Sequence, residues 1–251
     1  PVDWGMAEPE NGKFDFSFFD LTMKKMKEHG LIPVHVLGGE LFRQPYLEGN
    51  GGYARRNPLP AWVLPLAERP AVHPENAMQK LKGYIAYPPI QYWTRYMTEL
   101  AKHSKGEKQF FEFTNEPNLY VTPQVYRKYL KATYTALKKG DPNAKLIGFC
   151  ATSDFKADGS GWLARAFQDG GLNSCDIVSF HPYDQRELAS IQPADKAIQD
   201  IFAAMKRFGR TLPLWNTELY YLYDGGNNDE SRPEYWLNRA LVDCGEGVSQ
   251  S

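Results

Sequence analysis

Runs of apolar residues alternate along the chain with stretches in which apolar positions recur every three or four residues. The runs have the length of buried strands, and the stretches between them have the period of amphipathic helices. Buried strands separated by helices are typical of a parallel sheet built from βα units. The pattern predicts five strands, at residues 31–38, 109–116, 145–152, 176–183 and 212–219.

Signals for helix ends fall between these runs. His29 and Gly30 close one helical stretch with a cation and a glycine, which suit a helix C-terminus. Thr122 and Pro123 have the residue types of an N-cap and a first helical position, and Gly140 is expected just after the end of that helix. Further helices are predicted within residues 88–104, 193–209 and 232–245.

Glycine, proline and asparagine concentrate in the long segment from Gly38 to Pro89. A connection of this length is too long for a plain turn. Long loops of a barrel commonly carry binding residues. We therefore expect a loop insertion at a working face.

Composition narrows the class of partner. The chain has 251 residues, 42% of them hydrophobic, which fits one large α/β domain spanning residues 1–251. The formal net charge of -1 gives no global attraction to nucleic acid or to an acidic membrane surface. No apolar run approaches the roughly 20 residues of a membrane span. The expected partner is a neutral molecule.

No cofactor is predicted. The three cysteines lack the CxxC pairing of a zinc site, and no glycine-rich phosphate loop follows any predicted strand. Aromatic residues make up 14% of the chain, including six tryptophans and fifteen tyrosines. Flat aromatic faces suit the apolar faces of sugar rings, although large rings also supply much of any core.

Polar side chains recur where the predicted strands end. They are His35 with Glu40 beyond it, Glu116, His181 with Tyr183, and Glu218. His35 sits inside its strand, so it could equally be a core histidine. In an α/β barrel these strand ends converge on one mouth. Two glutamates there could divide the work of glycoside hydrolysis, which needs one carboxyl that donates a proton and a second that stays ionised.

At these residues the chain resembles a known group, the clan A glycoside hydrolases. "NEP" at 115–117 and "NTE" at 216–218 look like the acid/base and nucleophile motifs of these retaining enzymes, which have a (β/α)8 TIM barrel. Residues 3–34 are similar to the clan's passage from the second strand into the third, especially in families 39 and 42. "FTNEPN" with "YRKYLKATYTALKKGDPNAKLIG" looks most like family 39, and "FHPYD" is similar to the sixth-strand segment.

The resemblance implies a retaining glycoside hydrolase that cleaves β-glycosidic bonds in oligo- or polysaccharides. Glu116 would be the general acid/base and Glu218 the nucleophile. Asn115 would hydrogen-bond the sugar hydroxyl next to the reacting carbon, and Tyr183 would hold Glu218. His181 would line the site.

Four further aromatic residues are candidate sugar contacts. Trp4 stands at the expected end of the second barrel strand. Trp62 lies in "NPLPAW", which looks loosely like the loop after the third strand in family 42. Trp215 and Tyr220 flank Glu218 and could be sugar platforms, although Trp215 could equally belong to the core.

The resemblance also implies that the barrel is incomplete within these residues. If residues 31–38 form the third strand, the first strand lies outside this chain, and "GVSQS" at 247–251 looks like the first residues of the eighth strand. We therefore expect a fragment of a longer polypeptide whose further parts supply the missing strands. Independent activity of the 251 residues is in doubt on this reading.

Two other functions stay open. A metal-dependent sugar isomerase or epimerase would use His35, Glu116, His181 and Glu218 as ligands, because imidazole and carboxylate groups suit divalent metals. This reading requires His35 to point inward. A non-catalytic carbohydrate-binding barrel would use the aromatic residues, with the glutamates only hydrogen-bonding the sugar.

Overall fold

The five predicted strands form one parallel sheet. The computed structural model describes residues 3–37, 59–68, 85–152, 155–156, 158–182, 192–218 and 240–249. The strands are β1 (Val34–Leu37), β2 (Phe110–Phe113), β3 (Lys145–Ala151), β4 (Ile177–Phe180) and β5 (Leu214–Asn216). They lie in the order β1-β2-β3-β4-β5, with every neighbouring pair parallel. Successive strands of an α/β barrel have this order.

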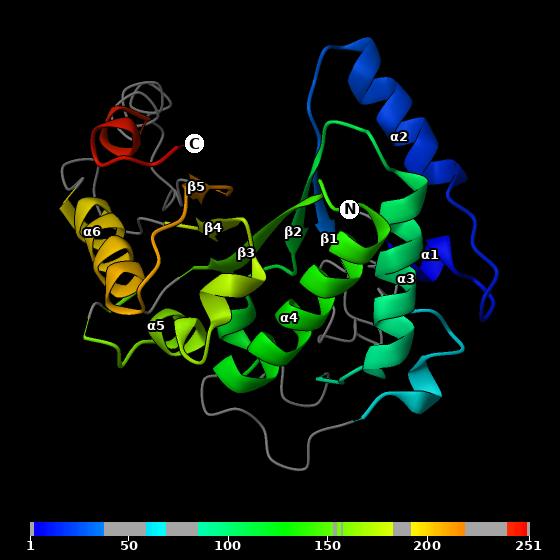
Figure 1. Cartoon of the computed structure of the whole chain (residues 1–251), viewed down its shortest axis with the longest axis horizontal. Helices are drawn as coiled ribbons and strands as arrows, with labels where there is room; N and C mark the ends of the chain where they lie inside the picture. Colours follow the sequence, from blue (N-terminus) through cyan, green and yellow to red (C-terminus); the bar gives the residue numbers. More distant parts are fainter. Residues whose placement is uncertain are drawn as a thin grey trace, which may run out of the picture.

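Helices connect the strands and cover one side of the sheet. Figure 1 shows them following one another around the outside of the curved sheet, from α3 beside β1 to α6 near β5. The helices are α2 (Ser17–Glu28), α3 (Ile90–His103), α4 (Pro123–Gly140), α5 (Trp162–Phe167) and α6 (Gln192–Arg207). Shorter elements are α1 (Trp4–Ala7), η1 (Leu64–Leu66), η3 (Pro117–Leu119) and η4 (Gly171–Ser174). Residues 240–245 are also helical.

The start of α4 follows its sequence signals, whereas its end does not. Thr122 is the N-cap, and its hydroxyl accepts a hydrogen bond from the Val125 amide at 3.3 Å. Gly140 is the last helical residue and not the residue after the helix. A Cβ atom there would lie 2.5 Å from the carbonyl oxygen of Thr98 and 2.6 Å from the Cβ of Ala101. The glycine therefore permits the close approach of α3 to α4.

Trp4 begins a helix and does not end a strand. Asp3 caps α1 by accepting a hydrogen bond from the Gly5 amide at 2.8 Å. The Trp4 ring is fully buried and stacks on Tyr96 with 5.6 Å between ring centroids, while its indole donates to Glu8 at 2.8 Å. The capping side chain favours a helical turn at this place, and the aromatic packing holds it.

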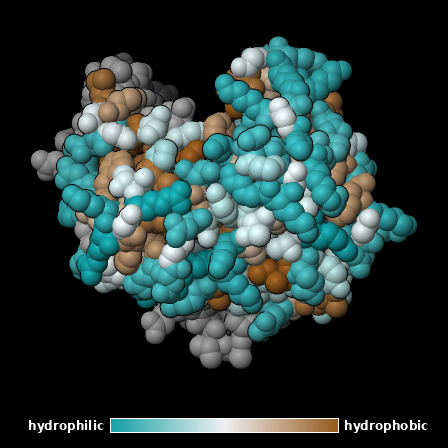
Figure 2. All heavy atoms as spheres, viewed as in Figure 1, coloured by the Kyte–Doolittle hydropathy of each residue, from teal (hydrophilic) through white to brown (hydrophobic). Residues whose placement is uncertain are grey.

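The two faces of the sheet have different partners. On the outer face Phe113 packs against Trp93 of α3 and Tyr126 of α4, with centroid separations of 6.2 and 5.5 Å. The opposite side of these helices is turned to solvent, and Figure 2 shows a mostly hydrophilic surface over α3 and α4. Because strand side chains alternate between faces, Phe110 and Glu112 point to the inner face.

Side chains on the inner face meet across the sheet in layers. Near the N-terminal ends of the strands, Phe110 contacts Trp215 with ring centroids 4.7 Å apart. In the next layer Glu112 accepts a hydrogen bond from the hydroxyl of Ser179 at 3.0 Å, and both residues are buried. Layered side chains of this kind fill the interior of α/β barrels. The next positions along the strands lie at their C-terminal ends.

A β-bulge interrupts β3. Gly148 pairs with Val178 and Ala151 pairs with Phe180, so Phe149 and Cys150 together oppose one residue of β4. Phe149 and Cys150 have positive φ angles of 81° and 44°. An extra residue of this kind bends its strand and changes the side-chain alternation beyond it. The bulge lies one layer below the strand ends.

The sheet is not closed among the residues that the structure describes. At the β1 edge Val34 is exposed, as are Leu31 and Ile32 before it and Phe18 and Leu21 of α2. Such an apolar edge is unusual on a free surface.

At the β5 edge the backbone amide of Ser249 donates to Leu214 at 2.8 Å, which is where the next barrel strand would pair. Both edges agree with the expected incomplete barrel.

Part of the predicted loop insertion packs onto the core. Leu59 and Val63 are buried, and Glu68 forms an antiparallel bridge with Tyr87. Residues 38–58 and 69–84, including Glu40, lie outside the described residues. No helix in the described ranges is both long enough and apolar enough to span a membrane.

Candidate active site

Glu116 is delivered by a tight turn at the C-terminal end of β2. Thr114 and Glu116 have positive φ angles of 53° and 42°, which non-glycine residues rarely adopt. Tyr120 fastens this turn, because its hydroxyl lies 3.0 Å from the Thr114 hydroxyl and also donates to the backbone carbonyl of Asn115. Pro117 then begins η3. Sparsely populated backbone conformations held by neighbouring contacts are typical of functional sites.

His181 follows the last residue of β4. Its backbone amide donates to the carbonyl of Ala151 at 2.8 Å, just past the bulge in β3. Its side chain is 1% exposed. His181 therefore leaves the sheet beside the end of the bulged strand β3, and its ring is buried.

Glu218 and Thr217 follow β5. Asn216, the last residue of β5, turns its amide to the outer face and donates to Asp243 at 2.8 Å. Alternation then directs the next side chain, Thr217, to the inner face. The Thr217 hydroxyl lies 3.2 Å from Nε2 of His181.

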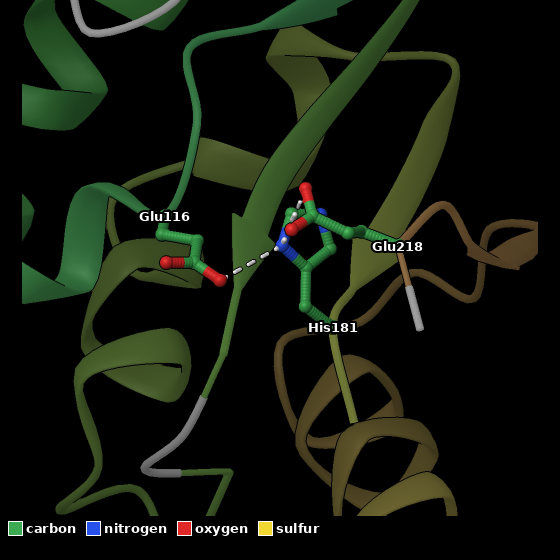
Figure 3. A group of neighbouring side chains, drawn as sticks. All are labelled: Glu116, His181 and Glu218. Carbon is green, nitrogen blue, oxygen red and sulfur yellow. Dashed lines mark hydrogen bonds and ion pairs between the residues drawn. The ribbon is translucent and has the colours of Figure 1, made fainter. Parts of the chain in front are cut away.

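Glu116, His181 and Glu218 form one cluster. The Nδ1 atom of His181 lies 3.3 Å from Oε1 of Glu116 and 3.9 Å from Oε2 of Glu218. Figure 3 shows one oxygen of Glu116 directed at the imidazole ring and the other directed away from it. The Glu116 side chain is 18% exposed and that of Glu218 is 49% exposed. The predicted convergence of these three side chains is present, and both carboxylates are accessible from the strand ends.

The same cluster has the donor types of a metal site. One ligand atom from each of Glu116, His181 and Glu218 lies within 4.8 Å of the other two. Two carboxylates and an imidazole suit a divalent cation. The arrangement is therefore compatible with either a pair of catalytic carboxyls or three metal ligands, and the remaining candidates help to decide.

His35 does not join the cluster. It points to the outer face, where Nε2 lies 3.3 Å from Sδ of Met23 and the ring packs 5.0 Å from that of Phe19. Burial lowers the pKa of His35 to about 4, so the ring is neutral near pH 7. The metal-dependent isomerase requires an inward His35, and the structure does not meet this requirement.

The three tryptophan candidates pack against other aromatic side chains. Trp62 is half-buried, donates to the carbonyl of Glu8 at 3.0 Å and packs on the edge of Trp4. Because Trp4 has no exposed surface, it presents no face to a ligand, contrary to the expectation that it lines the site. Trp215 is half-buried in the layer of Phe110.

The remaining candidates are Asn115, Tyr183 and Tyr220. Asn115 is half-buried next to Glu116 at the end of β2. Tyr183 and Tyr220 lie outside the described residues. Sequence reasoning missed Thr217 and Tyr120. Thr217 could have been found from its place directly before Glu218, two residues beyond the inward-facing Trp215.

No protein-family model and no curated protein sequence matches the chain. Solved structures do. A family 39 glycoside hydrolase from Bacteroides cellulosilyticus WH2 has a TM-score of 0.63 at 18% identity, over 98% of this chain and 47% of that chain. A monomeric β-xylosidase from Caulobacter crescentus CB15 has a TM-score of 0.58 at 17% identity, over 88% and 44% of the two chains. A family 10 xylanase from Thermobacillus composti has a TM-score of 0.60 at 14% identity, over 98% and 70%.

These likenesses concern the fold. The chain has the parallel α/β fold of the clan A glycoside hydrolases over nearly its whole length, which confirms the fold predicted from the resemblance. It spans less than half the length of the first two structures that it matches.

Proposed function

We propose that this chain forms the catalytic part of a retaining glycoside hydrolase that cleaves β-glycosidic bonds. The observation that carries the proposal is the approach of Glu116 and Glu218, whose facing oxygens lie within 4.8 Å of each other. Retaining enzymes have their carboxyls about 5 to 5.5 Å apart, whereas inverting enzymes leave about 6.5 to 9.5 Å for a water molecule. The spacing supports double displacement.

The roles follow from the motif resemblance. Glu218 attacks the anomeric carbon, the bond to the leaving oxygen breaks, and Glu116 gives its proton to that oxygen. A water molecule then attacks the anomeric carbon, the bond from this carbon to Glu218 breaks and frees the carboxylate, and Glu116 takes the proton that the water loses. Asn115 is proposed to bind the neighbouring sugar hydroxyl, and Tyr183 to hold Glu218. No cofactor takes part in this sequence of steps.

We further propose that the active unit includes other parts of the same polypeptide. The exposed apolar β1 edge and the partial coverage of the matched structures support this. The intact mass of the natural product tests it. A functional natural species containing only these 251 residues would contradict it.

The test of the catalytic assignment uses the full natural polypeptide and 4-nitrophenyl β-glycosides of xylose, glucose, mannose and galactose. Three of the matched structures are named a β-xylosidase, a glucosidase and an exo-β-1,4-mannosidase, which guides the choice. A 2-deoxy-2-fluoro glycoside of the best sugar should add one glycosyl mass to the protein, and Glu218→Gln should abolish that adduct. Glu99→Gln, which changes a half-buried glutamate paired with Lys102, is the matched control. Wild-type turnover by Glu218→Gln would overturn the assignment.

A metal-dependent isomerase is the second candidate because the three clustered side chains could hold a cation. His35 points to the outer face and is therefore not available as a fourth ligand. Aldose–ketose conversion that stops on chelation and returns with Mn²⁺ or Mg²⁺ would favour it. Glycan binding without hydrolysis, persisting in Glu218→Ala, would instead favour a non-catalytic carbohydrate-binding protein.

A further inference from the structure

Thr217 is placed to control the ring that contacts both glutamates. Its hydroxyl lies 3.2 Å from Nε2 of His181. The parallel register pairs Phe180 with Asn216, so the next residues on the two strands, His181 and Thr217, are neighbours. Their contact is therefore fixed by the sheet itself, and not by a flexible loop.

The two ring nitrogens of His181 face different groups. Nδ1 faces oxygens of Glu116 and Glu218, at 3.3 and 3.9 Å (Figure 3). A bare Nδ1 would direct its lone pair at two carboxylate oxygens, and a proton on Glu116 would relieve this repulsion only until Glu116 gives that proton away. A protonated Nδ1 donates to Glu116 and is attracted to both oxygens. We therefore assign the hydrogen to Nδ1.

In a neutral ring Nε2 is then an acceptor, and it needs a donor. His181 is 1% exposed, so its buried ring nitrogen relies on a protein partner. A threonine hydroxyl can rotate to donate, and Thr217 is within hydrogen-bonding distance. Which nitrogen of a histidine carries the proton is set by the bond that the other makes.

We propose that Thr217 is a positioning residue that holds His181 in its neutral Nδ1–H tautomer, and that this tautomer directs the proton of Glu116 to the carboxyl oxygen facing away from the ring. The catalytic consequence rests on the proposed function. The tautomer itself does not depend on it and can be measured separately.

The tautomer selects which oxygen of Glu116 reacts. Because Nδ1–H donates to Oε1, that oxygen is the carbonyl oxygen of the protonated carboxyl, and the proton sits on Oε2. Figure 3 shows this second oxygen directed away from His181. In the first step the Oε2–H bond breaks and the proton passes to the leaving oxygen. Glu116 is then a carboxylate that still accepts from Nδ1–H, so one tautomer serves both halves of the reaction.

Titratable groups lie beside this ring and in the layer beneath it. Among the described residues, Glu116 and Glu218 contact it directly. Glu112 and Cys150 lie one layer below, where both contact Ser179 on β4.

The direct test is ¹⁵N NMR of the full natural polypeptide labelled at histidine. Protonated and bare ring nitrogens have well-separated ¹⁵N shifts. The chain contains five histidines, and the signals that His181→Gln removes identify those of His181. We expect a protonated Nδ1 and a bare Nε2 at pH 7. A bare Nδ1 with a protonated Nε2, or a doubly protonated ring, would overturn the proposal.

Variants of Thr217 test its part. Thr217→Val keeps the shape and removes the hydroxyl, and we expect the population of the Nδ1–H tautomer to fall because Nε2 loses its donor. Thr217→Ser should keep it. Thr217→Ala, which also lacks the hydroxyl, replaces Thr217→Val if that protein fails to fold, and Thr135→Val at an exposed position of α4 is the remote control. An unchanged tautomer in a folded variant without the hydroxyl would overturn the role of Thr217.

Kinetics test the catalytic consequence. We expect Thr217→Val to lower kcat/KM about tenfold on glycosides with poor leaving groups and to shift the pH limb that reports the acid. Thr217→Ser should stay close to the wild type, and activated aryl glycosides should be little affected. Equal losses on both substrate types would overturn the link to Glu116. Absence of hydrolysis by the wild-type protein would overturn the proposed function and leave the NMR result to decide the tautomer.

Discussion

His35 and His181 are both buried histidines carried by the parallel sheet, yet they belong to different chemical environments. His35 lies within β1 on the outer face, against the sulfur of Met23 and the ring of Phe19. His181 lies just past β4, on the inner side, between two glutamates and a threonine hydroxyl. One ring is packed as an apolar group, and the other is surrounded by partners that can exchange protons.

The difference shows that position along a strand, and not residue type, decides which groups surround a buried histidine. Residues within a strand are committed to one face and to the layer that covers it. Residues just past the C-terminal end meet those from neighbouring strands. Four predictions test this contrast, from the largest expected effect to the smallest.

Replacing the carboxyl that faces His181 should have the largest effect. We expect Glu116→Ala to lower kcat/KM about 10³-fold on β-glycosides with poor leaving groups and less than about tenfold on activated aryl glycosides, because a good leaving group needs no proton. Steady-state kinetics on matched alkyl and aryl substrates measure this. Equal losses on both classes would remove Glu116 from the acid role.

Acidification should act on the protein through His35. Its folded pKa of about 4 lies below the ordinary value of 6.5, so the unfolded chain binds more protons between these values. The free energy of unfolding should therefore fall as the pH drops from 6.5 to 4, by up to about 3 kcal/mol from this group. Urea unfolding across this range measures the loss. The His35→Gln variant should not show this part of the pH dependence. An unchanged pH dependence in that variant would mean that His35 is not its source.

Exchanging the same substitution between the two sites should separate activity from stability. We expect His181→Gln to lower kcat/KM about 100-fold, since it disturbs the group that orients Glu116. His35→Gln should leave kcat/KM within about twofold and lower the free energy of unfolding by about 1 to 2 kcal/mol, because it places an amide against an apolar layer. Kinetics and unfolding on both variants measure this. If both variants lost activity and stability to the same extent, the two histidines would not differ in role.

Met23→Leu should have the smallest effect. Leucine conserves the apolar contact with His35 and removes only the sulfur, so the free energy of unfolding should change by less than about 1.5 kcal/mol. Activity should stay at the wild-type level. Thermal unfolding monitored by circular dichroism tests the first point. A larger loss would mean that the sulfur contact itself holds His35 in place.

Much of this arrangement could be predicted from local sequence. The five strands follow from apolar runs, and the start of α4 follows from Thr122 and Pro123, because both signals act within a few residues. The convergence of Glu116, His181 and Glu218 follows from their shared place after successive strands.

Other features depend on contacts that no local pattern records. A strand buried on both faces reads as a continuous apolar run, so "LIPVHVLG" gives no sign of which face His35 takes. Trp4 begins a helix because of the Asp3 cap and the ring of Tyr96, and the latter comes from α3. Gly140 stays in α4 because α3 passes against it. Thr217 was missed because its importance lies in its partner on another strand.

The bulge in β3 can be viewed as a one-residue insertion. Gly148 faces the helices, where an added Cβ would approach Cys175, and Phe149 packs on the ring of Phe167, 4.7 Å away. Cys150 then faces inward and contacts Ser179 at 3.1 Å. Counting without Phe149, Gly148 and Cys150 take the opposite faces that simple alternation gives to consecutive residues. The insertion thus adds one aromatic side chain to the outer core while the sequence of inward-facing residues below the glutamates is preserved.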